Sequence, residues 1–169
     1  MEKVLKHLTD IERKLSKIDK ISSKGASSLN MKEMIKLSRK GSSIDSCMKK
    51  CVKDYEGITP TDAQAKEVLA LLEKIASVNE KQMKLARDDK PAMDKMHAAG
   101  LVKKNIAKGQ ETSGAFWGTM VQKSPEGEIK ASVKALDEKV KGAVVETLRV
   151  YGDATGGEEV DIGGEDDSD

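Results

Sequence analysis

Apolar residues recur every three or four positions along most of this 169-residue chain, and this spacing restricts the fold more than any other feature. Between residues 4 and 18 they are Val4, Leu8, Ile11, Leu15 and Ile18, with lysines and acids between them. Such spacing gathers the apolar side chains on one stripe of an α-helix. Strand-type alternation is hard to find in the rest of the chain. The pattern therefore predicts an all-α protein.

The same rhythm and the helix breakers between its stretches predict four more helices, over residues 34–55, 60–86, 91–122 and 125–151. A small polar segment, 22–28, is expected to be a loop. Pro91 is expected to end the third helix, because the residue before a proline avoids the α region. The fourth holds four glycines and is expected to be weak or bent near Gly109, and Gly152 ends the fifth. We predict one bundle of about five antiparallel helices, residues 1–152, followed by a disordered acidic tail, residues 153–169.

The clearest boundary lies in the stretch 55–64. Gly57 suits the left-handed position just past a helix C-terminus. Thr59 is a good N-cap, and Pro60 fits the first helical position, where its missing N–H would be unpaired in any case. A sharp turn here predicts that the helices on either side pack as antiparallel neighbours.

Aromatic residues make up 2 % of the chain, so the core must be built from aliphatic side chains and methionine. The eight methionines suit two roles, filling gaps in such a core or lining an adaptable apolar cavity. Gly114 and Gly118, four apart, allow either close helix packing or space for a guest molecule. Phe116 and Trp117 point about 100° apart on a helix, so the two rings need not both face inward. An outward Trp117 would anchor the protein to an apolar surface.

The net charge of +1 hides an asymmetry, because residues 153–169 contain eight acids and no lysine or arginine. The remaining body is strongly basic and suits an anionic surface, although its lysines are also explained as solvated helix faces. Nucleic-acid binding is poorly supported, since arginine and stacking aromatic residues are scarce. No stretch is apolar and long enough for a transmembrane segment, and the N-terminus is not a signal peptide. The chain is expected to be cytoplasmic or the mature form of a secreted protein.

No catalytic motif is present: the sequence has no nucleophile elbow, phosphate loop or His-Glu-x-x-His motif. We therefore expect no enzymatic activity and no cofactor. Cys47 and Cys51 are one helical turn apart and are interpreted chiefly as half-buried free thiols. A disulfide remains open, although the Cβ directions on a helix make it awkward. A metal site with His7 or His97 also remains open, but no ligand spacing supports it.

Two stretches resemble the fungal hydrophobic-surface-binding protein A family, which includes the antigenic cell-wall galactomannoproteins. The first is Asp-Tyr-Glu-Gly-Ile-Thr at 54–59 with Asp-Ala-Gln at 62–64. The second is Lys-Pro-Ala-Met-Asp at 90–94 with Ala-Gly-Leu at 99–101. The start at 8–11 and the final helix also fit the layout of the family, so the resemblance covers roughly residues 4–151.

The resemblance implies a bundle of about five helices that is secreted or associated with the cell wall. Members of the family adsorb to hydrophobic surfaces and help to recruit hydrolases there, or hold fatty acids in an apolar cavity between the helices. This chain departs from the family in its richness in lysine, its cysteine pair, its acidic tail and the lack of a signal peptide. Relative to the family, residues 95–97 also resemble an insertion between the two parts of the second stretch, 90–94 and 99–101.

The hypothesis from the sequence is a non-enzymatic bundle that binds a fatty acid or similar lipid between its helices. The alternatives are adsorption to a hydrophobic surface and a helical protein-interaction module, such as a secreted effector. The apolar residues predicted to line the cavity, each also a core residue if no cavity exists, are Leu37, Ile44, Met48, Leu72, Ile75, Met83, Phe116, Met120, Val133, Leu136, Val140 and Val144.

Overall fold

The structure is a computed structural model that describes residues 1–25 and 28–164. These residues form five α-helices and no strand: α1 Glu2–Ser22, α2 Met31–Tyr55, α3 Asp62–Lys95, α4 Ala99–Lys123 and α5 Glu128–Val150. The prediction of an all-α bundle is confirmed. Residues 26–27 of the predicted loop and residues 165–169 of the predicted tail lie outside the described residues.

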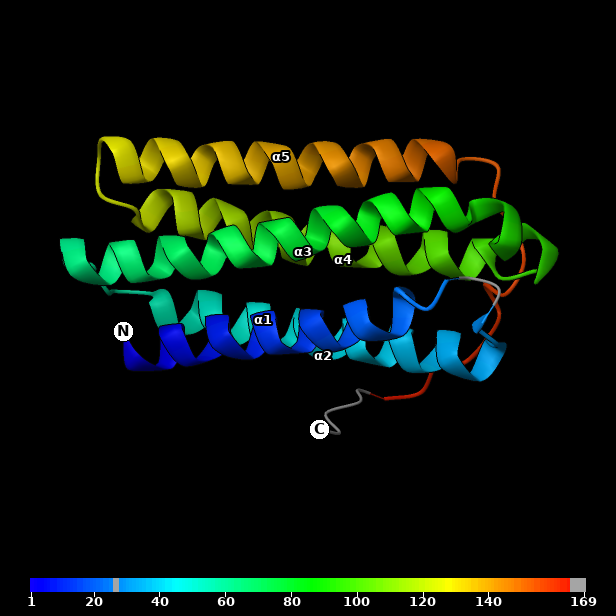
Figure 1. Cartoon of the computed structure of the whole chain (residues 1–169). Helices are drawn as coiled ribbons and strands as arrows, with labels where there is room; N and C mark the ends of the chain where they lie inside the picture. Colours follow the sequence, from blue (N-terminus) through cyan, green and yellow to red (C-terminus); the bar gives the residue numbers. More distant parts are fainter. Residues whose placement is uncertain (26–27, 165–169) are drawn as a thin grey trace.

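The helices lie with their long axes roughly aligned (Figure 1). Helix α1 packs against α2 and α3, α4 packs against α2 and α5, and α3 packs against α5. These pairs close a ring in the order α1, α2, α4, α5, α3. The predicted side-by-side packing of α2 and α3 is wrong for the described residues, because the apolar stripe of α1 packs on both helices and separates them. The two helices lie on opposite sides of the interior of the ring.

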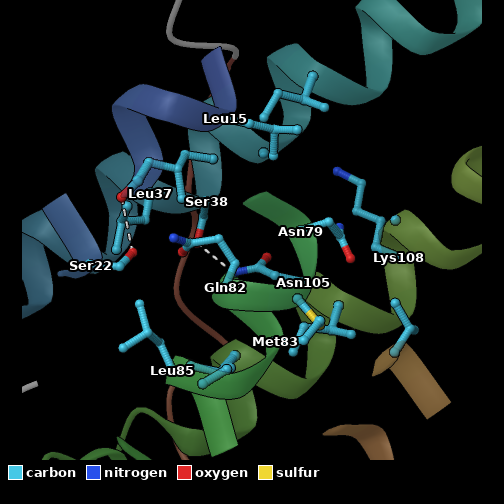
Figure 2. Close-up of a pocket in the computed structure, with 18 of the residues that line it drawn as sticks. Leu15, Ser22, Leu37, Ser38, Asn79, Gln82, Met83, Leu85, Asn105 and Lys108 are labelled. Atoms are coloured by element: carbon cyan, nitrogen blue, oxygen red, sulfur yellow. Dashed lines mark hydrogen bonds between the residues drawn. The ribbon is translucent and has the colours of Figure 1, made fainter. Parts of the chain in front are cut away.

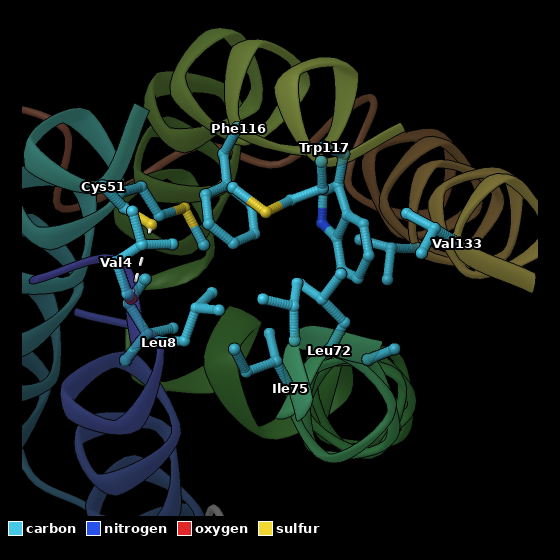
Figure 3. Close-up of a cluster of buried hydrophobic side chains, with 14 of the residues drawn as sticks. Val4, Leu8, Cys51, Leu72, Ile75, Phe116, Trp117 and Val133 are labelled. Carbon is cyan, nitrogen blue, oxygen red and sulfur yellow. Dashed lines mark hydrogen bonds between the residues drawn. The ribbon is translucent and has the colours of Figure 1, made fainter. Parts of the chain in front are cut away.

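The larger core cluster fills one half of this interior (Figure 3). Phe116 and Trp117 both lie inside it, with 0 % and 1 % of their surface exposed. Their rings meet edge to face, with centroids 5.7 Å apart and planes at 82°. The possibility, left open by the sequence, that Trp117 points outward is therefore wrong. The two side chains share the interior because α4 faces neighbours on more than one side, which widens its buried face beyond one stripe.

The turn between α2 and α3 differs in detail from the prediction. Gly57 has the expected left-handed backbone, with φ 69°. The N-cap of α3, however, is Thr61 rather than Thr59, and Pro60 lies outside the helix. Thr61 and Gln64 form a capping box, in which each side chain accepts a hydrogen bond from the backbone N–H of the other. This reciprocal pair satisfies two N–H groups at once, which a cap at Thr59 cannot do.

The predicted end of the third helix at Pro91 is also wrong, since α3 continues through Pro91 to Lys95. Met93, beyond the proline, is buried in the second core cluster, so tertiary packing holds the last turn in place. Pro91 has no N–H and so interrupts the hydrogen-bond ladder of α3. Close to this position the Tyr151 hydroxyl donates a hydrogen bond to the Ala86 carbonyl at 2.6 Å. Lys90 pairs with Asp94 across the proline at 2.9 Å. Accordingly the fourth helix begins at Ala99, not at Pro91.

The structure departs from the predicted tail over residues 153–164. This segment, here called the strap, crosses the first turn of α4 and reaches α2. The Leu101 N–H donates to the Gly156 carbonyl at 3.0 Å, and Lys104 Nζ donates to the Glu158 carbonyl at 2.6 Å. Arg39 of α2 donates to the Ile162 carbonyl. Ala154 is buried, so the strap belongs to the folded body.

Candidate ligand cavity

A cavity of about 280 Å³ occupies the half of the ring that the Phe116–Trp117 cluster does not fill. All five helices or their ends contribute to its wall, and Figure 2 shows a close-up of it. The volume is close to the lower limit of roughly 300–1,000 Å³ for small-molecule pockets. The space therefore suits one slender ligand.

The cavity exists because the side chains around it are too small or too thin to fill a five-helix ring. Helix α2 presents Ser38, Gly41 and Ser42 to it, and α4 presents Gly109 and Ser113. The remaining wall is mostly leucine, isoleucine, valine and methionine, with Tyr151 as its one aromatic member among the described residues. Aromatic side chains bury about 150–250 Å² each, so the half of the ring that holds Phe116 and Trp117 closes while this half stays open.

Five of the twelve residues predicted as lining reach the wall of this cavity. They are Leu37, Ile44 and Met48 of α2, Met83 of α3 and Val144 of α5. The structure places the other seven away from it, within or against the larger core cluster. Those seven are Leu72, Ile75, Phe116, Met120, Val133, Leu136 and Val140.

Sequence reasoning missed two groups of wall residues. The apolar ones include Leu15 and Ile18 of the stripe found between residues 4 and 18, and the signal that separates wall from core, position along the bundle, is absent from the sequence. These are Leu15, Ile18, Leu29, Met34, Leu85, Met93, Val102, Ile106 and Tyr151. The polar ones, chiefly Ser38, Asn79, Gln82 and Asn105, carry no sequence signal, because a polar residue on a helix is ordinarily a solvated one.

Several of the polar groups in the wall are already paired. The Asn105 amide donates to Ser38 Oγ, which donates in turn to the Met34 carbonyl at 3.0 Å. Gln82 Nε2 donates to Asp19 Oδ1 at 2.7 Å. Burial raises the pKa of the Tyr151 phenol well above its ordinary value, which keeps the hydroxyl protonated as a hydrogen-bond donor.

The strap closes one end of the cavity from outside. The second core cluster joins wall residues Leu29, Met34 and Met93 to Leu101 of α4 and Ala154 of the strap. Ile162 packs against the same cluster. The strap therefore covers the apolar end of the cavity and supports the first turn of α4.

The cysteines lie apart from the cavity wall. Cys51 is buried in the larger core cluster, and its thiol lies 3.9 Å from the Val4 carbonyl oxygen. Burial first, and then the Asp54 carboxylate and Cys47, raise the pKa of the Cys51 thiol from 9.0 to about 12. Cys47 and Cys51 are free thiols in the structure, with no disulfide bond between them. A thiol with a pKa this high is a weak nucleophile near neutral pH, because the thiolate is the reactive form.

The described residues also offer neither a metal site nor a membrane-spanning helix. No cluster of three His, Cys, Asp or Glu side chains suited to a metal ion occurs in the described part of the chain. His7 Nε2 instead lies 3.0 Å from Asp54 Oδ2 on the neighbouring helix. None of the helices in residues 1–25 and 28–164 is long and apolar enough to cross a membrane.

Comparison with known proteins gives matches to solved structures alone, since no protein-family model and no curated protein sequence matches the chain. The structure of AFMP4P in complex with palmitic acid has a TM-score of 0.78 at 13 % identity, covering 88 % of this chain and 97 % of that one. Ligand-binding domain 2 of the Penicillium marneffei MP1 protein, in complex with arachidonic acids, has a TM-score of 0.80 at 13 % identity, covering 92 % and 96 %.

Ligand-binding domain 1 of the same protein, complexed with arachidonic acids, has a TM-score of 0.74 at 14 % identity, covering 86 % of this chain and 94 % of that one. At such low identity the likeness establishes a shared fold. Each of these three structures was determined with a fatty acid bound, and each is matched over nearly its whole length.

Proposed function

We propose that this protein binds one molecule of a fatty-acid-like lipid in the cavity between its helices and catalyses no reaction. The observation that carries the proposal is the largely apolar cavity inside a ring of helices whose structural neighbours were solved with palmitic and arachidonic acids. Burying an alkyl chain is favourable by about 0.8 kcal/mol for each CH₂ group, so a lipid needs few polar contacts. Leu37, Ile44, Met48, Met83 and Val144 are proposed to contact the chain.

Adsorption to a hydrophobic surface has less support from the described residues. Trp117 is buried, and the large apolar side chains that remain exposed are Met31 and Val145, on different helices. Such isolated residues are ordinary on a protein surface and do not form a patch. No feature of the described surface singles out a protein partner either.

We also propose that the chain is a divergent relative of the hydrophobic-surface-binding protein A family and is secreted or associated with the cell wall. The motif resemblance at residues 54–64 and 90–101 supports this, together with the shared fold of the MP1-type domains. Immunodetection of the native protein in medium, wall and cytosolic fractions of the source cells tests the proposed location. Recovery from the cytosol alone would contradict it.

Native mass spectrometry of protein purified from cells tests lipid binding directly. We expect an added mass in the fatty-acid range, in a ratio of one ligand to one protein. Displacement of a fluorescent fatty acid by palmitic acid gives the affinity in solution. If neither measurement detects binding, the proposed function is wrong.

A pair of matched glycine variants locates the binding. Gly41 lines the cavity and Gly142 lies exposed on α5, and a Cβ at either position would meet nothing within 4 Å. Replacing either glycine removes the same helix penalty of about 1 kcal/mol. We expect Gly41→Leu to occupy the cavity and abolish displacement by palmitic acid, while Gly142→Leu binds as the unmodified protein does. Equal binding by both variants would place the lipid elsewhere.

A further inference from the structure

One residue of the cavity wall has a buried polar atom that the described part of the protein leaves without a hydrogen bond. Among the described residues, Asn79 Oδ1 is the buried side-chain atom of the cavity wall that has no hydrogen bond. The neighbouring polar groups Gln82 and Asn105 are paired with Asp19 and Ser38. Buried polar groups in proteins are nearly always paired, so an unpaired one in a residue of the cavity wall points to a partner that binds there.

An asparagine amide can present either of its two ends to that partner. The oxygen accepts a hydrogen bond, and a half-turn of the amide presents the N–H₂ group as a donor instead. The amide alone therefore does not decide between a ligand that donates and one that accepts. The positive charge beside the amide favours a ligand whose head group accepts hydrogen bonds.

Lys108 supplies a positive charge at the same end of the cavity. Its side chain lines the wall and is exposed, and among the described residues it has no acidic partner. In Figure 2, Asn79 and Lys108 lie on one side of the cavity, opposite Leu37 and Leu85. Asp45, whose carboxylate lies 3.6 Å from where a Cβ on Gly109 would be, also lines this end but has interactions of its own within the protein.

The opposite end of the cavity is mostly apolar and covered, and the charged side chain that lines it there, Asp89, is acidic and disfavours a second carboxylate. Met93 lies fourteen residues beyond Asn79 on α3, a distance of roughly 20 Å along a helix axis. Met34 and Leu29 join it there beneath the strap. One end of the cavity thus has a lysine and an unpaired amide, and the other has mainly apolar side chains and one acid, a difference that favours one direction for an elongated anionic amphiphile.

We propose that the ligand is a single-chain carboxylate whose ionised head binds between the Asn79 amide and Lys108 Nζ, with its alkyl chain extending toward Met93. This inference rests on the proposed function and adds to it the charge and the direction of the ligand. Neutral long-chain molecules, such as alcohols and methyl esters, fill the same cavity but leave Lys108 without a partner. Hydrogen bonds to a charged group are about twice as strong as those between neutral groups, which sets the preference for the acid.

Four ligands with the same C16 chain test the preference by displacing a fluorescent fatty acid: palmitic acid, methyl palmitate, hexadecanol and hexadecylamine. We expect palmitic acid to bind about tenfold or more tightly than each of the others, the size of effect that one charged hydrogen bond gives. Equal affinity for all four would overturn the inference and leave lipid binding intact. Tighter binding of the alcohol or the amine would overturn it as well, by showing that the polar end of the cavity prefers a head group that donates hydrogen bonds.

Variants of the two residues test the site itself. We expect Asn79→Leu and Lys108→Gln each to lower the affinity for palmitic acid by about tenfold and to leave the affinity for hexadecanol unchanged. Lys134→Gln, on an exposed position of α5 outside the cavity, is the matched charge control and should leave both affinities unchanged.

A stability measurement separates loss of the site from loss of the fold. Asn79→Leu removes an unpaired buried acceptor, so the melting temperature of the ligand-free variant should rise. A stable variant that binds palmitic acid as tightly as the unmodified protein would overturn the role of Asn79. If no ligand displaces the probe from the unmodified protein, the proposed function fails and this inference fails with it.

Discussion

Trp117 and Phe116 together determine which half of the helix ring is closed. Their rings lie edge to face among residues from all five helices, whereas the other half of the interior has no comparable side chain except Tyr151 at its end. The sequence shows that these two rings exist and that the rest of the core is aliphatic. It does not show that both point inward, because that depends on how many neighbours α4 has.

Truncating Trp117 should be among the most destabilising single changes in the molecule. We expect Trp117→Ala to lower the free energy of unfolding by about 3–5 kcal/mol, through lost burial and the void left behind. Chemical denaturation followed by circular dichroism measures the change. Val145→Ala, at a position that is 58 % exposed, is the control and should stay within about 0.5 kcal/mol of the parent. A small effect at Trp117 would contradict the packing described for α4.

The buried acids Cys51 and Tyr55 predict a loss of stability at alkaline pH. Burial is the main cause that raises the pKa of Cys51 from 9.0 to about 12 and that of Tyr55 from 10.0 to about 12. The unfolded chain releases these protons at lower pH than the folded one. The stability they contribute is therefore complete below pH 9 and falls as the pH rises toward 12.

Denaturation midpoints measured between pH 8 and pH 12 test this expectation. We expect the unfolding free energy to fall by a few kcal/mol across this range, and Cys51→Ala to flatten part of the decline. A decline of the same steepness in the variant would show that the thiol is not responsible.

At the scale of the elements, the helix positions were largely predictable and the helix ends were not. The apolar spacing located all five helices, since it reflects the stripe that each buries. The end of α3 was misplaced because Met93 and Tyr151, which hold its last turn, act through contacts distant in sequence. Five of the twelve predicted lining residues reach the wall of the cavity, and the others do not for the same reason. Whether a residue of an apolar stripe lines the cavity or packs in the core depends on its position along the bundle axis.

The strap is the element that sequence reasoning missed. Helix α4 begins at Ala99, and its N-cap residue Ala98 provides no side-chain cap; the first turn also contains no acid. The strap provides the missing partners, because the Gly156 carbonyl accepts from the Leu101 N–H and the Glu158 side chain lies against Gly100. The carbonyl satisfies one of the free N–H groups of the helix N-terminus, and a carboxylate close to that end interacts favourably with its positive dipole.

A change at Gly156 tests the strap. Its φ of 97° disfavours any other residue, and a Cβ there would lie 2.8 Å from the His97 carbonyl oxygen. We expect Gly156→Ala to destabilise the protein by about 1–3 kcal/mol and to speed hydrogen exchange at the Leu101 N–H. Gly164→Ala is the matched control, since a Cβ there meets nothing within 4 Å. Unchanged exchange at Leu101 would contradict the capping role.

For the molecule as a whole, the ring order α1, α2, α4, α5, α3 could not be read from the sequence. Amphipathic stripes specify that helices pack but leave open which pairs are neighbours. A ring of five encloses more space than two touching layers of helices, and a core poor in aromatic residues does not fill it. The cavity follows from these two facts together.

Ligand binding should stabilise the entire ring. A ligand present at 100 times its dissociation constant adds about 2.7 kcal/mol to the free energy of unfolding. For a chain of this size we expect palmitic acid to raise the melting temperature by roughly 5–10 °C. Differential scanning fluorimetry measures the shift, and Gly41→Leu should show none. A shift of equal size in that variant would indicate binding outside the cavity.

The strap also has a consequence for how the chain reaches its native state. Arg39 of α2 and the Ile162 carbonyl of the strap are 123 residues apart in sequence, whereas α1 and α2 meet through a short loop. Closing the longer loop costs more chain entropy, so contacts of this separation form late unless other structure has already brought them together. Helix α5 must dock before the strap can reach α4. We therefore expect the strap, and with it the first turn of α4, to become rigid late in folding, so that the covered end of the cavity is completed in that step.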